Sequence, residues 1–284
     1  MKKIKVSLIS TVLNEEKNID YFIRSIIAQT NRSAEFIIVD GGSKDKTYQI
    51  LKKFSKKYGW VRVFQKKGAN ISQGRNYAIK KAKYDIIVTA DAGTKFRKDW
   101  LKNLIEGFNG VASYGKNIAK INGNEFQRLI AKKIMHDGAY GSSRNMIFSK
   151  KIWNEIGGYP EDMIRGEDSL FDLRIMKRSH KINMIENAIG EWEMRLSLKE
   201  VKKQYYQYGY WDGVAYRRYK TILLKTKLAV IGLILLLPLY PLGQLISKFS
   251  LSFKVDFIRR FAFLKGFYRG LLRKPEFKKK EIPI

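Results

Sequence analysis

The 284-residue chain contains no cysteine and only two histidines, His136 and His180. Without cysteine it has no disulfides, no thiolate metal ligands and no cysteine nucleophile. Two histidines are too few for a multi-histidine metal centre. Acid–base chemistry therefore falls mainly to carboxylates, and these are themselves scarce, with 26 Asp and Glu against 56 Lys and Arg.

The shortage of acidic residues leaves a formal net charge of +30. Such a charge requires an anionic partner, and nucleic acid, phospholipid headgroups and phosphorylated substrates all qualify. From Lys199 onward the chain holds nineteen Lys and Arg against five Asp and Glu, and its most apolar stretch lies in the same region. A basic and apolar combination favours an anionic membrane surface over nucleic acid, for which no recognised motif is present.

Patterns typical of strands and helices alternate over the first hundred residues. Residues 5–12 alternate in polarity, 36–39 form a continuous apolar run, and 61–64 and 85–90 are also strand-like. Residues 19–27, a segment around 50–54, and residues 72–83 have the spacing of helices with one apolar face. This alternation predicts an α/β fold with a doubly wound, mostly parallel sheet flanked by helices. Further on, we expect helices at 125–135 and 169–178 and strands at 146–149 and 182–186.

Polar side chains stand directly after three of the predicted strands. Asn14 and Glu15 follow the first strand, Asp40 the second and Asp91 the fourth. In parallel sheets, ligands bind outside the carboxyl ends of the strands. Asp and Gly are also ordinary turn residues, which would explain any one of these positions. Three acidic strand ends in one half-domain favour a binding site.

These strand ends belong to an ordered series of motifs. The segments are Thr11–Glu16, Val39–Thr47, Gly68–Asn70, Gly74–Ala78, Thr89–Gly93, Gly141–Asn145, Gly157–Glu161 and Gly166–Leu173. The series resembles the family 2 glycosyltransferases, which have the GT-A fold, a Rossmann-like mixed and mostly parallel sheet. One such segment would be a weak signal, whereas the ordered set over residues 5–200 is specific.

The resemblance implies a nucleotide-sugar donor bound at the strand ends. Its donor-site residues in this chain are Thr11, Leu13, Asn14, Glu15, Asp40, Gly42, Gly68, Arg75 and Asp91. Asp40 would accept a hydrogen bond from a base N–H, and the Arg75 guanidinium suits phosphate oxygens. A solvated helix charge is the alternative interpretation of Arg75.

Asp91 is the position at which the resemblance implies a divalent cation, Mg²⁺ or Mn²⁺. The family usually has a second aspartate two residues later, but this chain has Gly93 there. Mg²⁺ often takes only one or two carboxylates, with phosphate and water completing its shell. A single Asp91 is therefore sufficient in principle, and a degenerate site in a non-catalytic relative is the alternative.

Glu167 and Asp168 are the predicted catalytic pair. Transfer with inversion needs a base that removes the proton of the acceptor hydroxyl. A retaining mechanism needs a second carboxylate as nucleophile, and no separate motif supplies one. Asp168 is therefore the predicted base, and Glu167 is predicted to orient the acceptor or a basic neighbour, although acidic residues also favour a helix start. The predicted acceptor-binding residues are Arg144, Asn145, Trp192 and Arg195. A buried structural role is the alternative for Trp192.

The composition changes near residue 200, which predicts a catalytic domain at 1–200 and a basic helical region at 201–284. Residues 228–246 carry no charge and include Pro238 and Pro241, which favours a re-entrant membrane segment. Residues 251–273 resemble an interfacial helix, with Phe257, Phe261, Leu264, Tyr268 and Leu271 on one face. A buried core helix is the alternative.

No signal peptide is visible, so we expect the catalytic domain to be cytoplasmic. The apolar and basic C-terminal region predicts that the enzyme is membrane-associated. The basic tail favours a lipid-linked acceptor or another glycan of the cell envelope. A nucleotidyltransferase or a basic nucleic-acid-binding protein are the competing classes. The sugar, the base and the oligomeric state are left open.

Overall fold

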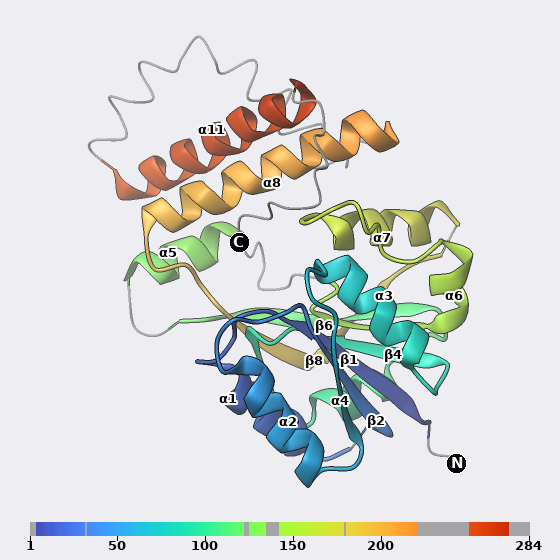
Figure 1. Ribbon diagram of the computed structural model, residues 1–284. Helices are drawn as coiled ribbons and strands as arrows, with labels where there is room; N and C mark the ends of the chain where they lie inside the picture. Colours follow the sequence, from blue (N-terminus) through green and yellow to red (C-terminus); the bar gives the residue numbers. More distant parts are fainter. Residues whose placement is uncertain are drawn as a thin grey trace. The chain divides into compact units, whose positions relative to one another are not determined.

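The computed structural model describes residues 4–31, 33–121, 125–134, 142–178, 180–220 and 250–272. The chain forms two compact units, Met1–Leu196 and Ser197–Ile284. Figure 1 shows the first unit as a sheet with helices on both faces and the second as a pair of helices.

The described residues of the first unit contain one eight-stranded sheet with the order β3-β2-β1-β4-β7-β6-β8-β5. Strands β3, β2, β1 and β4 are parallel to one another, and β6 is parallel to β8. The pairs β4–β7, β6–β7 and β5–β8 are antiparallel. The strands are β1 (Val6–Val12), β2 (Glu35–Asp40), β3 (Val61–Gln65), β4 (Ile86–Ala90), β5 (Thr94–Phe96), β6 (Ala112–Lys120), β7 (Asn145–Ser149) and β8 (Asn183–Glu193).

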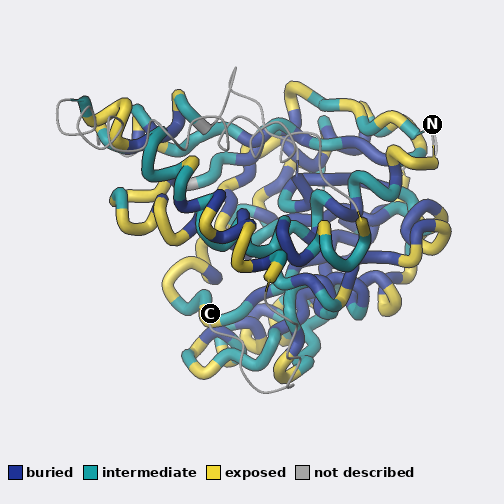
Figure 2. The backbone as a smooth tube through the Cα atoms, turned by 90° about the horizontal axis from the view of Figure 1, so that it is seen from above, coloured by how far each residue is buried: buried dark blue, intermediate teal, exposed yellow. Residues whose placement is uncertain are grey.

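Helices cover both faces of the sheet. Neighbouring residues of the central strands point to opposite faces, so each contacts a different set of helices. Leu8 packs with α1 (Ile19–Ile27), α2 (Thr47–Lys57) and α4 (Trp100–Glu106). Ile9 packs with α3 (Ile71–Lys81), α6 (Lys150–Glu155) and α7 (Glu167–Lys177). The unit also contains α5 (Glu125–Ile134). Burial on two faces explains why β2 reads as a continuous apolar run, and Figure 2 shows how buried and exposed backbone alternates along the chain.

The predicted fold class is confirmed. The four strands and three helices expected in the first hundred residues all form. The strand ends shift by at most one residue, and α2 extends three residues beyond each end of the segment expected around 50–54. The strand expected at 182–186 continues to Glu193, so Trp192 lies within β8. The short strand β5 and the strand β6 are additional to the expected elements.

The second unit consists of α8 (Leu198–Tyr219) and α11 (Leu251–Leu272), which run side by side (Figure 1). Four glycines bring the two backbones into contact. A Cβ atom at Gly209 would lie 1.9 Å from the Phe263 carbonyl oxygen, and one at Gly213 would lie 2.2 Å from that of Phe267. Because these contacts advance along both helices together, α8 and α11 are parallel.

The glycines also correct the expected face of α11. Leu264, expected on an outer apolar face, is 4% exposed, while Tyr268 is 41% exposed. The buried face is set by the small residues that allow close packing, Ala262, Gly266 and Gly270. The predicted membrane segment at 228–246 lies outside the described residues. Among the helices that the structure describes, none combines the length and the apolar character needed to cross a bilayer.

Candidate active site

The loops after β1 and β2 are joined by hydrogen bonds at the carboxyl edge of the sheet. The backbone N–H of Asn14 donates to the Ser43 hydroxyl (2.8 Å), and the Lys44 N–H donates to the Asn14 side chain (2.9 Å). The Glu15 N–H donates to the Thr47 hydroxyl (2.8 Å). The structure therefore brings the two predicted donor-site loops together.

Asp40 is fully buried at the end of β2. Its Oδ1 atom accepts hydrogen bonds from the N–H groups of Gly42 (2.9 Å) and Ser43 (3.0 Å) and from the Gln65 amide (3.1 Å). The Ser43 hydroxyl donates to its Oδ2 atom. These bonds shape the turn after β2, and in this conformation the carboxylate has no surface exposed to a base N–H.

Two further predicted donor residues, Gly42 and Gly68, have φ angles of 103° and 76°. This region suits glycine, so both residues serve the loop conformation. Thr11 faces α3, because a Cβ at Gly74 would lie 2.6 Å from its methyl group. Leu13 is half-buried in the loop after β1.

Arg75 links the two halves of the candidate site. Its Nη2 atom donates to Asp91 (2.9 Å) and its Nη1 atom to Glu167 (3.0 Å), while its side chain is 3% exposed. The guanidinium also lies over the Tyr159 ring, 5.2 Å from the ring centre. Because both ends of the guanidinium are occupied, the structure gives Arg75 a different role from the predicted one. It holds the donor-side and acceptor-side carboxylates together and is not open to phosphate.

The electrostatics of this centre follow from its burial. Burial raises the pKa of Glu167, the neighbouring Asp168 carboxylate raises it further, and the Arg75 guanidinium opposes the shift. Burial also raises the pKa of Glu15, to which the charges of Asp45 and Asp91 contribute. Glu15 and Glu167 therefore share one electrostatic environment with Asp91.

Asp168 is the second residue of α7, which begins directly after Gly166, whose φ is 73°. Its Oδ1 atom accepts a hydrogen bond from the Ser169 N–H (2.8 Å), and its side chain is partly exposed. The ring of Phe171 on the same helix stacks on Tyr159 at 4.0 Å between centres. This packing fixes the start of α7 beside Arg75 and leaves the Asp168 carboxylate open to a substrate.

Asp172 lies within the Gly166–Leu173 motif, but no role was predicted for it. It lies one turn after Asp168, and Tyr114 of β6 hydrogen-bonds to it. Its Oδ1 atom is buried and has no hydrogen-bond partner among the described residues. Burial and the Asp168 charge raise its pKa well above the ordinary value, against the effect of Tyr114 and Arg75. The spacing of four residues on a helix was the available signal.

Asn145, predicted to bind the acceptor, is buried inside the sheet. Its amide nitrogen donates to the carbonyls of Lys116 (3.3 Å) and Ala188 (3.1 Å), and its oxygen accepts from the Trp100 indole (2.6 Å). A side chain enclosed in this way is not available to a substrate. The structure therefore gives Asn145 a structural role, which is to tie β7 to β6 and β8.

Of the other predicted acceptor residues, Arg144 contacts Asp91 through its backbone and Trp192 through its side chain. Arg144 accepts a backbone hydrogen bond from the Asp91 N–H (3.2 Å), and its guanidinium lies 4.3 Å from the centre of the Trp192 ring. Arg195 is exposed just beyond β8. Arg144 and Trp192 thus form a stacked pair, and the backbone of Arg144 adjoins that of Asp91.

Asp91 is also the predicted metal ligand, and its surroundings fit one cation. Its side chain is 24% exposed, and Arg75 contacts its Oδ1 atom, which leaves Oδ2 for an ion. No group of three or more Asp, Glu or His side chains in the described part of the chain is arranged to hold a metal. Asp91 alone can hold a cation whose shell is completed by diphosphate oxygens and water. A Cβ at Gly93 would meet nothing within 4 Å, so a second carboxylate would fit there.

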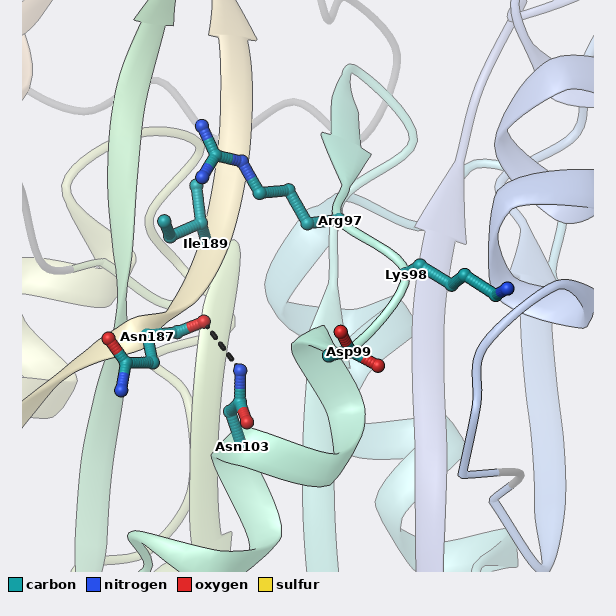
Figure 3. A pocket seen from close by; sticks show the side chains of 6 residues that line it. All are labelled: Arg97, Lys98, Asp99, Asn103, Asn187 and Ile189. Carbon is teal, nitrogen blue, oxygen red and sulfur yellow. Dashed lines mark hydrogen bonds between the residues drawn. The ribbon is translucent and has the colours of Figure 1, made fainter.

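A separate pocket of ≈ 490 Å³ is drawn in Figure 3. It is lined by Arg97, Lys98, Asp99, Asn103, Asn187 and Ile189. The Asn103 side chain donates to the Asn187 carbonyl (2.8 Å), as the dashed line in Figure 3 shows. None of the predicted site residues lines this pocket, so we do not assign the active site to it.

Comparison with known proteins fits this geometry. Residues 7–166 match the domain described as Glycosyl transferase family 2, and the chain belongs to that family. It is a glycosyltransferase. A relative from Methanococcus voltae is 27% identical over 281 residues, covering 89% of this chain and 87% of the relative. That protein is named dolichyl N-acetyl-alpha-D-glucosaminyl phosphate 3-beta-D-2,3-diacetamido-2,3-dideoxy-beta-D-glucuronosyltransferase. Glycosyltransferase AglE of Haloferax volcanii is 22% identical, with 70% of each chain covered.

Two solved structures show the same fold. The mannosyltransferase PcManGT from Pyrobaculum calidifontis, in complex with GDP-Man and Mn²⁺, superposes with a TM-score of 0.68 at 15% identity, covering 95% of this chain and 88% of that one. S. aureus TarS 1-349, in complex with UDP-GlcNAc, gives a TM-score of 0.55 at 19% identity, with 72% and 65% covered. This chain spans 38% of a longer TarS chain. At these identities the likeness concerns the fold.

Proposed function

We propose that this glycosyltransferase inverts the anomeric configuration of the sugar it moves. The donor is a nucleotide sugar, and the acceptor is the hydroxyl of a lipid-linked or other cell-envelope glycan at an anionic membrane surface. The observation that carries the proposal is the Arg75 bridge. It connects Asp91 to Glu167, at 2.9 and 3.0 Å, and places Asp168 next in the chain with its carboxylate partly exposed.

On the acceptor side, Asp168 is the general base. It takes the proton of the acceptor hydroxyl as that oxygen forms a bond to the anomeric carbon. The bond from this carbon to the diphosphate oxygen breaks on the opposite face, and the nucleoside diphosphate leaves. Glu167 is unsuited to act as a nucleophile in a retaining mechanism, because its side chain is 8% exposed and is paired with Arg75.

On the donor side, Asp91 with one Mg²⁺ or Mn²⁺ holds the diphosphate. A bound cation would neutralise the charge that develops on the leaving phosphate. The loops after β1 and β2, with Asn14, Glu15 and Asp40, surround the nucleoside. Mn²⁺ in the GDP-Man complex of PcManGT supports the use of a cation by this fold.

The names of the relatives support the acceptor class. The Methanococcus voltae relative is named for a dolichyl-phosphate-linked sugar, and the relative from Rhizobium meliloti is a succinoglycan biosynthesis protein. The second unit supports a membrane location, because α11 exposes Lys254, Arg260, Lys265 and Arg269 on a helix that also exposes Leu251 and Phe253. Such a helix suits the headgroup region of an anionic bilayer.

The product of the reaction tests the proposal. The full-length protein is incubated with a membrane extract, Mn²⁺ and a panel of nucleotide sugars that includes UDP-GlcNAc and GDP-Man. We expect mass spectrometry to find a lipid or glycan enlarged by one sugar residue, with release of the nucleoside diphosphate. A product that carries the nucleotide itself would identify a nucleotidyltransferase. No product from any donor would favour a non-catalytic relative.

A further inference from the structure

Arg144 and Arg75 differ in how their charges are balanced. Arg75 is fully enclosed and bonded to two carboxylates. Arg144 is partly exposed, and no described residue accepts a hydrogen bond from its guanidinium. Its Nε atom is buried without a partner. A partly desolvated cation without a counter-ion is costly unless a ligand supplies the missing charge.

The guanidinium of Arg144 is nevertheless held in place. It lies 4.3 Å from the centre of the Trp192 ring, within the range of a cation–π contact. Trp192 is fixed in turn, because β8 pairs with both β5 and β6 at this point, through Thr94 and Ala119. The pair is therefore a preformed feature on a rigid part of the sheet. A guanidinium that is oriented in advance loses less entropy when it binds an anion.

The backbone of Arg144 adjoins the backbone of Asp91, the donor-side carboxylate residue. The Arg144 carbonyl accepts the Asp91 N–H (3.2 Å), and the Thr94 N–H donates to the Asp91 carbonyl (3.0 Å). The hydroxyl of Thr94, opposite Trp192 in the sheet, is also buried without a partner among the described residues. Arg144 and Thr94 thus each carry a buried hydrogen-bond donor that has no acceptor among the described residues. Both residues adjoin Trp192 and Asp91.

We propose that the stacked pair of Arg144 and Trp192 is a phosphoryl-binding site, in which the guanidinium binds phosphate oxygens next to Asp91. The proposal deepens the proposed function and rests on it. It moves the phosphate contact expected at Arg75 to Arg144. The phosphoryl group belongs to the donor diphosphate or to a phosphorylated lipid acceptor, and both present the same oxygens to the planar fork of the guanidinium.

Titration calorimetry on the full-length protein in Mn²⁺ distinguishes these two sources. UDP is the probe for the donor, and farnesyl phosphate, compared with farnesol, is the probe for a lipid phosphate. Arg144→Gln removes the charge, and we expect a loss of affinity of about ten- to hundredfold for the probe that uses the site. A loss of affinity for UDP alone identifies the donor diphosphate as the group that binds Arg144. Loss for farnesyl phosphate, with farnesol unchanged, identifies the acceptor.

Two further variants separate binding from a structural effect. Trp192→Phe keeps a stacking surface and should retain most of the affinity, whereas Trp192→Leu should resemble Arg144→Gln. Arg97→Gln is the matched control, because it removes an arginine that is already paired, with Glu191 at 3.5 Å, at the same edge of the sheet. It should leave both affinities unchanged.

The proposal is wrong if Arg144→Gln binds UDP and farnesyl phosphate as the unmodified protein does, or if Arg97→Gln reduces affinity to the same extent. That result would leave the proposed function intact as long as the unmodified protein still transfers sugar. Absence of transfer by the unmodified protein, with loss of UDP affinity in Arg144→Gln, would instead contradict the proposed function and retain the phosphoryl site.

Discussion

The two units of the chain use glycine and charge in opposite ways. In the first unit, Gly42, Gly68 and Gly166 have positive φ angles in the loops that carry the site, and carboxylates gather at the strand ends. In the second unit, glycines such as Gly209 lie inside helices, where two backbones touch, and basic side chains face outward. The first arrangement forms the candidate active site, and the second forms a basic helix pair. Variants in the second unit should therefore leave UDP affinity unchanged, and variants in the first unit should leave vesicle binding unchanged.

The largest effect is expected from Asp168→Asn. The change keeps the size of the side chain and removes the proton acceptor, so transfer should fall by about 10²–10⁴-fold. The affinity for UDP, measured by calorimetry, should change little. Glu167→Gln should reduce transfer less, because Glu167 only orients the centre through Arg75. Near-normal transfer by Asp168→Asn would show that Asp168 is not the general base.

The next effect concerns the cation. Asp91→Asn should weaken UDP binding in Mn²⁺ by about tenfold or more, because a carboxylate ligand and the partner of Arg75 are lost together. Gly93→Asp should tighten binding of Mn²⁺, since the added side chain has open space. Titration of Mn²⁺ in the presence of UDP measures both changes. Full activity of the unmodified enzyme in excess chelator would show that no cation is required.

A smaller effect is expected from Gly209→Ala in the second unit. The added Cβ would lie 1.9 Å from the Phe263 carbonyl oxygen and should force the helices apart. The cost of such overpacking is about 1–3 kcal/mol, and the better helix propensity of alanine offsets up to about 1 kcal/mol of it. Binding to anionic lipid vesicles, measured by sedimentation, should weaken while UDP affinity stays the same.

Gly59→Ala is the matched control for that change, because nothing lies within 4 Å of a Cβ at that exposed turn. It should alter neither vesicle binding nor stability. If Gly209→Ala lost UDP affinity to the same extent as vesicle binding, the two units would not have separate roles.

The smallest effect is a change in how stability depends on pH. Burial raises the pKa of Asp172 well above its ordinary value of 3.8, so the folded protein keeps a proton that the unfolded chain releases. As pH rises above 3.8, this difference lowers the free energy of unfolding until the folded-state pKa is passed. Asp172→Asn should therefore be more stable than the unmodified protein at neutral pH, and this advantage should disappear below pH 3.8.

Denaturant unfolding at several pH values measures the effect, with Asp85→Asn, at an exposed position, as the control. An advantage of Asp172→Asn that is independent of pH would mean that the side chain acts through packing and not through its proton.

The sequence predicted the sheet well where each strand is buried on both faces. The apolar run of β2 and the helix pattern of α1 depend on local periodicity, and both form where expected. Strand β6 was not predicted, because it mixes Gly115, Lys116 and Asn117 with apolar residues and has a register shift opposite β8. Its formation depends on its neighbours more than on its own pattern.

The motifs predicted a candidate site, but they did not reveal the contacts of every residue in it. Arg75 was expected at a phosphate, and only its distances to Asp91 and Glu167 show that it joins two carboxylates. The burial of Asn145 beneath Trp100 depends on strand pairing across the sheet, which no local pattern reveals. Asp172 was visible in the sequence, but its burial against Tyr114 was not.

The stereochemistry of the product tests the central claim most directly. The purified product of the unmodified enzyme is examined by ¹H NMR, and the coupling constant of its anomeric proton is compared with that of the donor. With Asp168 as base and Glu167 held by Arg75, a single displacement must occur, so the product should carry the opposite anomeric configuration. A product with the configuration of the donor would contradict the account.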